Sequence, residues 1–361
     1  MKQILALDGG GIRGIFTLAV LRRVQELLRE HYGRPDLVLA DHYDLFAGTS
    51  TGAIIATCLC WGMTVEAILD LYTKFGATMF TPVPWYRPFK KYLVSRYEAK
   101  PLSAFLQRLF SEDEEGKVAA LLDSARLKKN LLVVVRNHTS GSAWPLTNNP
   151  GAIYNNTSRA DCNMRIPLWK IVRASTAAPV YFDPEEIALE GNPLVFVDGG
   201  ITPYNNPALI AALTAIVPNY RMSWEAGPDK IRVVSIGTLQ FSSGLPANVH
   251  KLWVGYNAAN IPAALMQGVA WQQDCLCRCL GKCIYGEELD SEIGDLVNAD
   301  LPGSRWFSYV RYDKTYKAER LHEILRLNPK LDQLDAIEAI PILEKLGREF
   351  AEQHVMLEHL I

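Results

Sequence analysis

Short apolar runs alternate with segments of helical periodicity along the first 240 residues. The run at residues 3–7 ends in a glycine-rich turn, and residues 15–28 then carry apolar side chains three or four positions apart. The same order returns with a strand-like run at residues 43–47, a glycine turn and an apolar helix at residues 53–61. This repeated order predicts an α/β fold in three layers, with a mainly parallel central sheet and helices on both faces.

Other apolar runs extend this pattern along the rest of the chain. Further buried strands are predicted at residues 131–135, 194–197 and 231–236. Beyond residue 252 the pattern becomes mainly helical and closes with an amphipathic segment at residues 336–360. Because the sequence has no internal repeat or linker, a single domain over residues 1–361 is predicted. It comprises an α/β core at 1–240, an insertion within that core at 79–101, and a mainly helical portion at 250–361.

Charge and hydropathy limit the classes of partner. The 37 basic and 39 acidic residues give a net charge of -2, which argues against a nucleic acid polymer as partner. The N-terminal sequence lacks the basic and apolar regions of a secretion signal, so a cytoplasmic location is expected. The longest uncharged stretch, residues 45–65, is broken by a glycine turn, and its apolar part is shorter than the roughly 18 residues that span a bilayer. Any action on lipid is therefore expected as peripheral contact with the inner face of the cell membrane.

The cysteines do not indicate a metal site. Their number, seven, is odd and suggests no disulfide framework. Four of them lie close together at Cys275, Cys277, Cys279 and Cys283. The paired C-x2-C knuckles of zinc sites are absent, as is a cluster of oxygen ligands for calcium. The sequence therefore predicts no metal and leaves the role of the cysteine cluster open.

The second glycine turn reads GTSTG at residues 48–52 and fits the pattern G-x-S-x-G. In that pattern a serine stands on a strained turn between a strand and a helix, where free N–H groups and the helix dipole favour negative charge. Because the expected strand and helix flank the motif, Ser50 is a candidate nucleophile, with Gly48 and Gly52 as supporting residues. The alternative is a glycine turn with a capping serine.

The first glycine turn reads DGGGIRG at residues 8–14. Consecutive glycine N–H groups at a helix start can converge on one oxygen, which suits an oxyanion hole. The same glycines also satisfy the dinucleotide pattern G-x-G-x-x-G. That pattern needs an acidic residue about 20 positions further on, at the end of a second strand. Since residues 26–30 are still predicted to be helical, the oxyanion interpretation is favoured.

A third turn contains Asp198, Gly199 and Gly200 and follows the apolar run at residues 194–197. An acidic residue beside glycines at a strand end can simply open a turn. However, three glycine-rich turns at the ends of three predicted parallel strands converge on the edge where α/β proteins bind ligands. This convergence predicts that Asp198 lies close to Ser50 and to the first turn.

The order DGGGIRG, GTSTG and DGG resembles that of the patatin-like phospholipases. The segment RASTAAPVYF at residues 173–182 is also similar to the family segment that precedes the aspartate. The resemblance covers roughly residues 3–240. It implies the patatin-like form of the α/β fold, with Ser50 as nucleophile and Asp198 as base. It also implies an oxyanion loop made of Gly9, Gly10, Gly11 and Arg13.

Histidine is the residue that a serine hydrolase ordinarily uses as its base, because a carboxylate with a pKa near 4 is a weak base toward an alcohol. Of the seven histidines, only His250 is even loosely placed after Asp198, and His322, His354 and His359 fall in helical stretches. The resemblance implies a Ser-Asp dyad without histidine. Desolvation by an acyl chain would raise the basicity of Asp198.

The resemblance implies a lipid acyl hydrolase of the phospholipase A type, which releases fatty acids from membrane phospholipids and needs no cofactor. A nucleotide-binding oxidoreductase and a catalytically inactive binding module are the alternatives. The chain also resembles the bacterial phospholipase effectors of antiphage signalling, which are switched on by cyclic oligonucleotides. A cyclic dinucleotide activator is therefore expected as a partner in addition to the phospholipid substrate.

The insertion at residues 79–101 is rich in proline, aromatic and basic residues. Aromatic side chains suit a membrane interface, while Arg87, Lys90 and Lys91 attract phosphate. Two uses fit this composition, namely contact with a membrane and binding of an anionic activator. The insertion is expected to regulate access to the site in either case.

Overall fold

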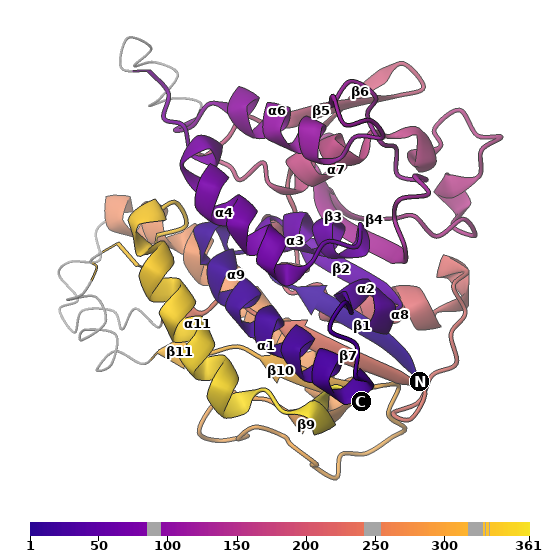
Figure 1. Cartoon of the computed structure of the whole chain (residues 1–361), viewed down its shortest axis with the longest axis vertical. Coiled ribbons are helices and arrows are strands. Elements are labelled where there is room, and N and C mark those ends of the chain that lie inside the picture. Colours follow the sequence, from indigo (N-terminus) through magenta and orange to yellow (C-terminus); the bar gives the residue numbers. More distant parts are fainter. Residues whose placement is uncertain (85–94, 242–253, 317–327, 329, 332) are drawn as a thin grey trace.

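The structure of the chain is a computed structural model (Figure 1). It describes residues 1–84, 95–241, 254–316, 328, 330–331 and 333–361. The basic residues Arg87, Lys90 and Lys91 lie outside the described residues, as do His250 and His322.

A nine-stranded sheet forms the centre of the described chain, with the order β5-β6-β3-β2-β1-β7-β10-β9 and with β4 paired to β3. Neighbouring strands from β3 to β9 in this order pair in parallel, whereas β4 and β6 pair with β3 in antiparallel orientation. The strands are β1 (Lys2–Leu7), β2 (Leu45–Thr49), β3 (Asn130–Asn137), β4 (Ser142–Thr147), β5 (Glu185–Leu189), β6 (Asn192–Asp198), β7 (Ile231–Ile236), β9 (Lys282–Tyr285) and β10 (Ser308–Tyr312). A separate pair is formed by β8 (Gln240–Phe241) and β11 (Thr315–Tyr316).

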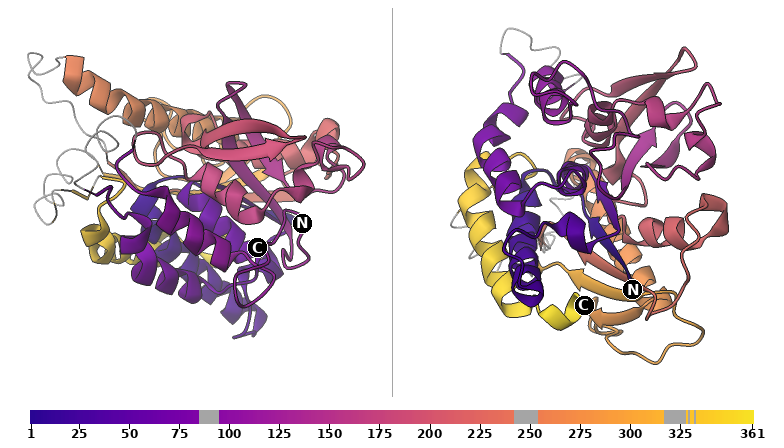
Figure 2. Two further views of the ribbon diagram at one scale, coloured as in Figure 1. Left: turned by 90° about the horizontal axis from the view of Figure 1, so that it is seen from above. Right: turned by 45° about the vertical axis from the view of Figure 1, so that its right-hand side comes forward.

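Helices cover both faces of the sheet (Figure 2). One layer contains α1 (Gly14–Tyr32), α3 (Thr51–Cys60), α4 (Val65–Met79), α6 (Ala99–Leu109), α7 (Leu168–Ser175) and α11 (Ile340–His354), with the short α2 (Leu39–His42) beside them. The opposite layer contains α8 (Ala208–Ile216) and α9 (Val254–Leu280). No helix in the described ranges has the length and apolar character that a membrane span requires.

Successive side chains of β1 point to opposite faces of the sheet and so enter two separate hydrophobic cores. Leu5 and Leu7 point into the core beneath α1 and α3, whereas Ile4 and Ala6 point into the core beneath α8. Both faces of the strand are buried, which is why the sequence shows a continuous apolar run there. The mainly parallel sheet between two helical layers confirms the predicted fold class.

Two features of the sheet differ from the sequence-based expectation. The strand that ends at Asp198 was expected to be parallel, but β6 runs antiparallel to β3, because its partner and direction depend on contacts distant in sequence. The portion after residue 250 does contain α9 and α11, yet it also adds β9 and β10 to the central sheet. These two strands are short, and β10 contains Arg311, so neither shows a long apolar run.

The C-terminal helix α11 packs along α1, at the other end of the chain (Figure 2). Gly347 permits this close approach, because a Cβ there would overlap the Cβ of Ala19. Near the chain ends, the side chain of Gln3 donates a hydrogen bond to the carbonyl of Leu360 at 3.3 Å. The last segment is therefore part of the same packed body as the first strand.

Candidate active site

Ser50 stands in the turn between β2 and α3 with φ 54° and ψ -122°. Residues other than glycine rarely adopt this conformation, so the surroundings must hold it in place. The turn is tight because a Cβ at Gly48 would overlap the carbonyl of Gly52, and one at Gly52 would overlap the carbonyl oxygen of Leu7. Since α3 begins directly after Ser50, the first N–H groups of that helix lie beside the hydroxyl.

The hydroxyl of Ser50 donates a hydrogen bond of 2.7 Å to Oδ2 of Asp198. The other carboxylate oxygen, Oδ1, accepts the N–H of Gly200 at 2.6 Å. Burial raises the pKa of Asp198 to about 6, although the hydrogen bonds from Ser50 and Gly200 and the charge of Arg173 act in the opposite direction. The carboxylate is therefore a stronger base than an exposed aspartate and is already in contact with the serine proton.

The pairing of β3 explains why these two residues meet. Residue Val134 of β3 pairs with Thr49 at the end of β2, and the next residue, Val135, pairs with Asp198 at the end of β6. Because β4 occupies the other edge of β3, β2 and β6 share one edge and run toward each other. Their carboxyl ends therefore meet, with Ser50 following one strand and Asp198 ending the other.

The segment after α7 secures both strand ends. The hydroxyl of Ser175 accepts the backbone N–H of Ser50 at 2.9 Å and donates to the carbonyl of Val134 at 2.7 Å. Two residues later, the carbonyl of Ala177 accepts the N–H of Asp198 at 3.0 Å. The segment lies within the motif at residues 173–182, although no role for Ser175 could be predicted from that motif. Its side chain fills the break between the two strands that share the edge of β3.

The glycine loop after β1 lies directly against the serine. A Cβ at Gly9 would come within 3.1 Å of the Cβ of Ser50. Gly10 and Gly11 line the same cavity as Ser50, and their N–H groups meet no acceptor in the described part of the chain. Gly11 has φ +59°, a conformation that favours glycine. These two N–H groups are available to an oxygen that develops negative charge next to Ser50.

Arg13 supports this loop from outside the cavity. Its guanidinium donates to the carbonyls of Gly10 at 3.3 Å and of Leu239 at 3.2 Å. The N–H of Gly9 donates to the carbonyl of Asn205 at 3.2 Å, and the carbonyl of Gly9 accepts the hydroxyl of Thr238 at 3.3 Å. The side chains of Ser50 and Asn205 fill the space in front of Gly9. A dinucleotide pyrophosphate would have to approach the loop through this space, so the packing argues against dinucleotide binding here.

A buried arginine that the sequence did not single out fixes the start of the loop. Arg311 of β10 donates to both carboxylate oxygens of Asp8, at 2.9 and 2.6 Å, and also to Ser235 and Asp313. Burial would lower the pKa of Arg311, but the carboxylates of Asp8 and Asp313 outweigh it and raise the pKa. The signal in the sequence was an arginine inside an otherwise apolar strand, together with an aspartate at the end of β1 that needs a buried cation.

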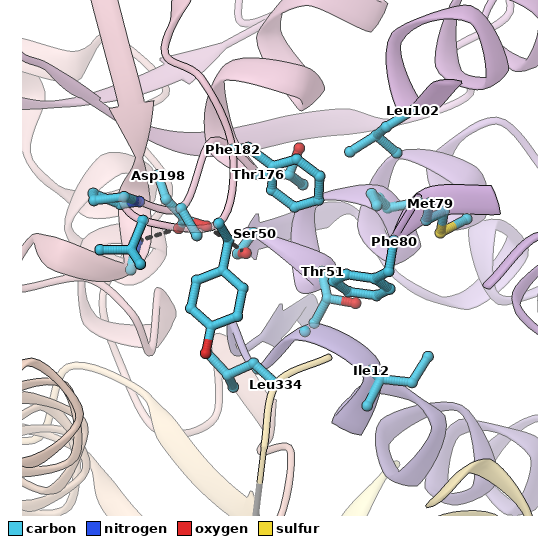
Figure 3. A pocket seen from close by; sticks show the side chains of 18 of the residues that line it. Ile12, Ser50, Thr51, Met79, Phe80, Leu102, Thr176, Phe182, Asp198 and Leu334 are labelled. Atoms are coloured by element: carbon cyan, nitrogen blue, oxygen red, sulfur yellow. Dashed lines mark hydrogen bonds between the residues drawn. The ribbon is translucent and has the colours of Figure 1, made fainter. Parts of the chain in front are cut away.

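A cavity of about 360 Å³ opens next to the serine (Figure 3). Ser50 and Asp198 lie on one side of it, and apolar side chains cover the other, namely Ile12, Met79, Phe80, Leu102 and Phe182. Such a lining excludes water and accommodates a hydrocarbon chain. The site can thus combine a nucleophile, a buried base, free N–H donors and an apolar cavity.

Histidine and cysteine side chains lie away from this cavity in the described part of the chain. None of the described histidines lines it, and His359 instead contacts the hydroxyl of Tyr312 at 2.9 Å. Cys277 is buried beneath the sheet, while Cys275 and Cys279 lie on the partly exposed side of α9. Over the ranges that the structure describes, no group of three or more potential ligands is placed to hold a metal ion.

The fold and the site define a three-layer α/β protein in which a serine in a glycine-rich turn contacts an aspartate at the end of a neighbouring strand. Residues 5–212 match the family model of the patatin-like phospholipases, and the chain belongs to this family.

Three curated relatives have names that describe their activity. A cGAMP-activated phospholipase of Vibrio cholerae serotype O1 is 27% identical, with 66% of this chain and 64% of the relative covered. A cGAMP-activated phospholipase of Escherichia coli is 25% identical, covering 70% and 67%. A calcium-independent phospholipase A2-gamma of Rattus norvegicus is 29% identical, covering 67% and 29%. The matches thus span about two thirds or less of the length of these relatives.

We expect the reactivity of Ser50 to follow the protonation of Asp198. Only the ionised carboxylate can accept the serine proton, so labelling by a fluorophosphonate probe should fall about tenfold per pH unit below the pKa of about 6. At pH 5 the labelling rate should be about a tenth of its plateau at pH 8. Gel fluorescence of probe-treated protein measures this rate.

A loss of folded protein caused by the titration of Asp198 cannot explain the expected fall in labelling at low pH. Its pKa in the folded chain is above the ordinary value of 3.8, so its protonation favours the folded state as the pH falls through 6. The Asp198→Asn variant should label slowly at every pH. A flat profile between pH 5 and pH 8 in the unmodified protein would contradict the role of this carboxylate.

We expect Ser175→Ala to weaken both the fold and the site. The change leaves the carbonyl of Val134 and the N–H of Ser50 without their shared partner, which should cost about 1–3 kcal/mol of the free energy of unfolding. Probe labelling of Ser50 should also slow, because the strained turn loses a support. Denaturant titration and labelling measure the two effects, with Ser103→Ala on α6 as the matched control that changes neither. Equal behaviour of the two variants would rule out the bridging role.

Proposed function

We propose that the chain is a lipid acyl hydrolase of the phospholipase A type that releases fatty acids from membrane phospholipids through Ser50 and Asp198. The observation that carries the proposal is the 2.7 Å contact between these side chains in the wall of an apolar cavity. Family membership and the names of the bacterial relatives support the same activity.

The reaction proposed is a two-step acyl transfer. The oxygen of Ser50 attacks the ester carbonyl as its proton passes to Asp198, and the N–H groups of Gly10 and Gly11 stabilise the oxyanion. Asp198 then gives the proton to the leaving lysophospholipid alcohol. In the second step Asp198 takes a proton from the water that attacks the acyl-serine ester. It then gives this proton to the oxygen of Ser50 as the fatty acid is released, which restores the starting serine and carboxylate. An acyl chain in the cavity would displace water from around Asp198 and strengthen it further as a base.

We expect Ser50→Ala and Asp198→Asn each to lower fatty acid release by at least about a thousandfold, since loss of a nucleophile or its base costs orders of magnitude. The double variant should be scarcely worse, because the two residues act as a unit. Mass spectrometry of mixed phospholipid vesicles, with free fatty acid and lysolipid quantified, measures the rate. The exposed Asp123 and the partly buried Ser124, changed to Asn and Ala, provide a matched control. Retention of a tenth of the rate by either single variant would refute the assignment.

We further propose activation by a cyclic dinucleotide, with the protein acting at the cytoplasmic face of the cell membrane in antiphage defence. The two bacterial relatives are named cGAMP-activated phospholipases, and a phospholipase inside a cell needs control to spare the membrane of its host. Two hydrogen bonds near the site connect residues 334–335 to the oxyanion loop and to the cavity rim. The carbonyl of Leu334 accepts the N–H of Ile12 at 2.8 Å, and Asp335 accepts the hydroxyl of Tyr97 at 2.6 Å. A ligand that moves residues 334–335 would therefore alter the oxyanion loop.

We expect fatty acid release from vesicles to rise at least tenfold when the matching cyclic dinucleotide is added, since a ligand that favours the active state by about 1.4 kcal/mol shifts the equilibrium tenfold. The variant Arg87→Ala/Lys90→Ala/Lys91→Ala should need more nucleotide for the same rate if these cations bind its phosphates. A panel of cyclic dinucleotides tests this, with Lys117→Ala/Lys128→Ala/Lys345→Ala as a control of equal charge. Full activity without nucleotide would remove the switch, and activation untouched by the first triple variant would place the pocket elsewhere, after residue 250.

A further inference from the structure

Arg96 lies on the rim of the cavity that contains Ser50. Its backbone is fixed on both sides, because its N–H donates to the carbonyl of Val180 at 2.9 Å and its carbonyl accepts the N–H of Val83 at 3.0 Å. The next residue, Tyr97, is held in turn by the carbonyl of Tyr181 at 2.9 Å. Although the side chain is exposed, the place from which it projects is therefore well defined.

The charge of Arg96 has no acidic partner among the described residues. Its guanidinium lies over the ring of Tyr181, 5.5 Å from the ring centre, and forms no ion pair with an acidic side chain among the described residues. Among the described residues that line the cavity, Arg96 is the one basic side chain and Asp198 the one acidic side chain. The remaining lining is largely apolar or uncharged. Among the described residues, the rim thus presents one unpaired cation above a cavity that suits an acyl chain.

A phospholipid has the complementary distribution of groups. Its acyl chain is apolar, its ester lies next to the glycerol, and its phosphodiester is the anion close to that ester. A guanidinium binds a phosphodiester through two parallel N–H donors, and stacking on an aromatic ring orients the plane of those donors. A neutral glyceride offers the same acyl chain and ester without the anion.

We propose that Arg96 binds the phosphodiester of the substrate head group and thereby gives the enzyme its preference for phospholipids over neutral glycerides. This inference rests on the proposed lipid hydrolase function. It assigns Arg96 to substrate binding and gives it no part in the chemical step at Ser50. The phosphodiester of a cyclic dinucleotide has the same chemistry, so the test must separate the two sources.

The test compares two soluble substrates with identical acyl chains, dihexanoyl phosphatidylglycerol and dihexanoylglycerol, both below the concentration at which they aggregate. Arg96→Gln should lower kcat/KM for the phospholipid about tenfold to a hundredfold, mainly through KM, because charge-assisted hydrogen bonds are lost. Hydrolysis of dihexanoylglycerol should change less than about twofold. Arg96→Lys should fall between these values for the phospholipid, because it keeps the charge but loses the paired donors.

Arg126→Gln is the matched control, because Arg126 also lies over an aromatic ring, that of Trp61 at 4.5 Å, but does not line the cavity. Its ratio of the two kcat/KM values should equal that of the unmodified protein. Failure of the unmodified protein to hydrolyse either lipid, with and without cyclic dinucleotides, would refute the proposed function itself. Hydrolysis of both lipids with a ratio unchanged by Arg96→Gln would overturn the head-group assignment alone. An unchanged ratio together with a higher nucleotide requirement would assign Arg96 to the activator instead.

Discussion

The site depends on one edge of β3, along which two strands approach each other from opposite directions. Strand β2 ends at Thr49 and β6 ends at Asp198, opposite consecutive residues of β3. A sheet edge offers only one set of hydrogen-bonding groups, so two strands that share it must both stop where they meet. The break leaves backbone groups to be satisfied, and Ser175 satisfies two of them. The serine turn and the aspartate are thus brought together by strand pairing, before any side chain contact forms.

Desolvation gives this junction its proposed chemistry. The pKa of Asp198, about 6, is close to the ordinary value of about 6.5 for histidine. A carboxylate with that basicity can serve where most serine hydrolases use an imidazole. The apolar cavity and the closely packed glycine loop exclude water from around Asp198. The N–H groups of Gly10 and Gly11 in the same loop meet no acceptor among the described residues. One feature, exclusion of water, thus accounts for both a strong base and effective N–H donors.

The sequence predicted the local parts of this arrangement better than the distant ones. The turns at residues 8–14 and 48–52 could be predicted because strand, glycine and helix are adjacent in the chain. The direction of β6 could not, since its residues look the same in a parallel and an antiparallel strand. Strands β9 and β10 were missed because they are short. The convergence of the three turns was expected from parallel strands, whereas in the structure it arises from the meeting of β2 and β6.

The buried pair of Asp8 and Arg311 links the glycine loop to the far end of the chain. Asp8 directly precedes the loop and is almost completely buried, and Arg311 provides the cation beside it. Removing one partner of such a pair leaves an uncompensated buried charge, which typically costs about 3–5 kcal/mol. Arg311 and Leu334 both contact the loop region, yet both lie beyond residues 5–212 that match the family model. The region that matches the family model therefore contains Ser50, Asp198 and the glycine loop itself. The region after it contributes Arg311 and Leu334, which fix that loop in place. A substitution after residue 212 can therefore act on the glycine loop without touching Ser50 or Asp198.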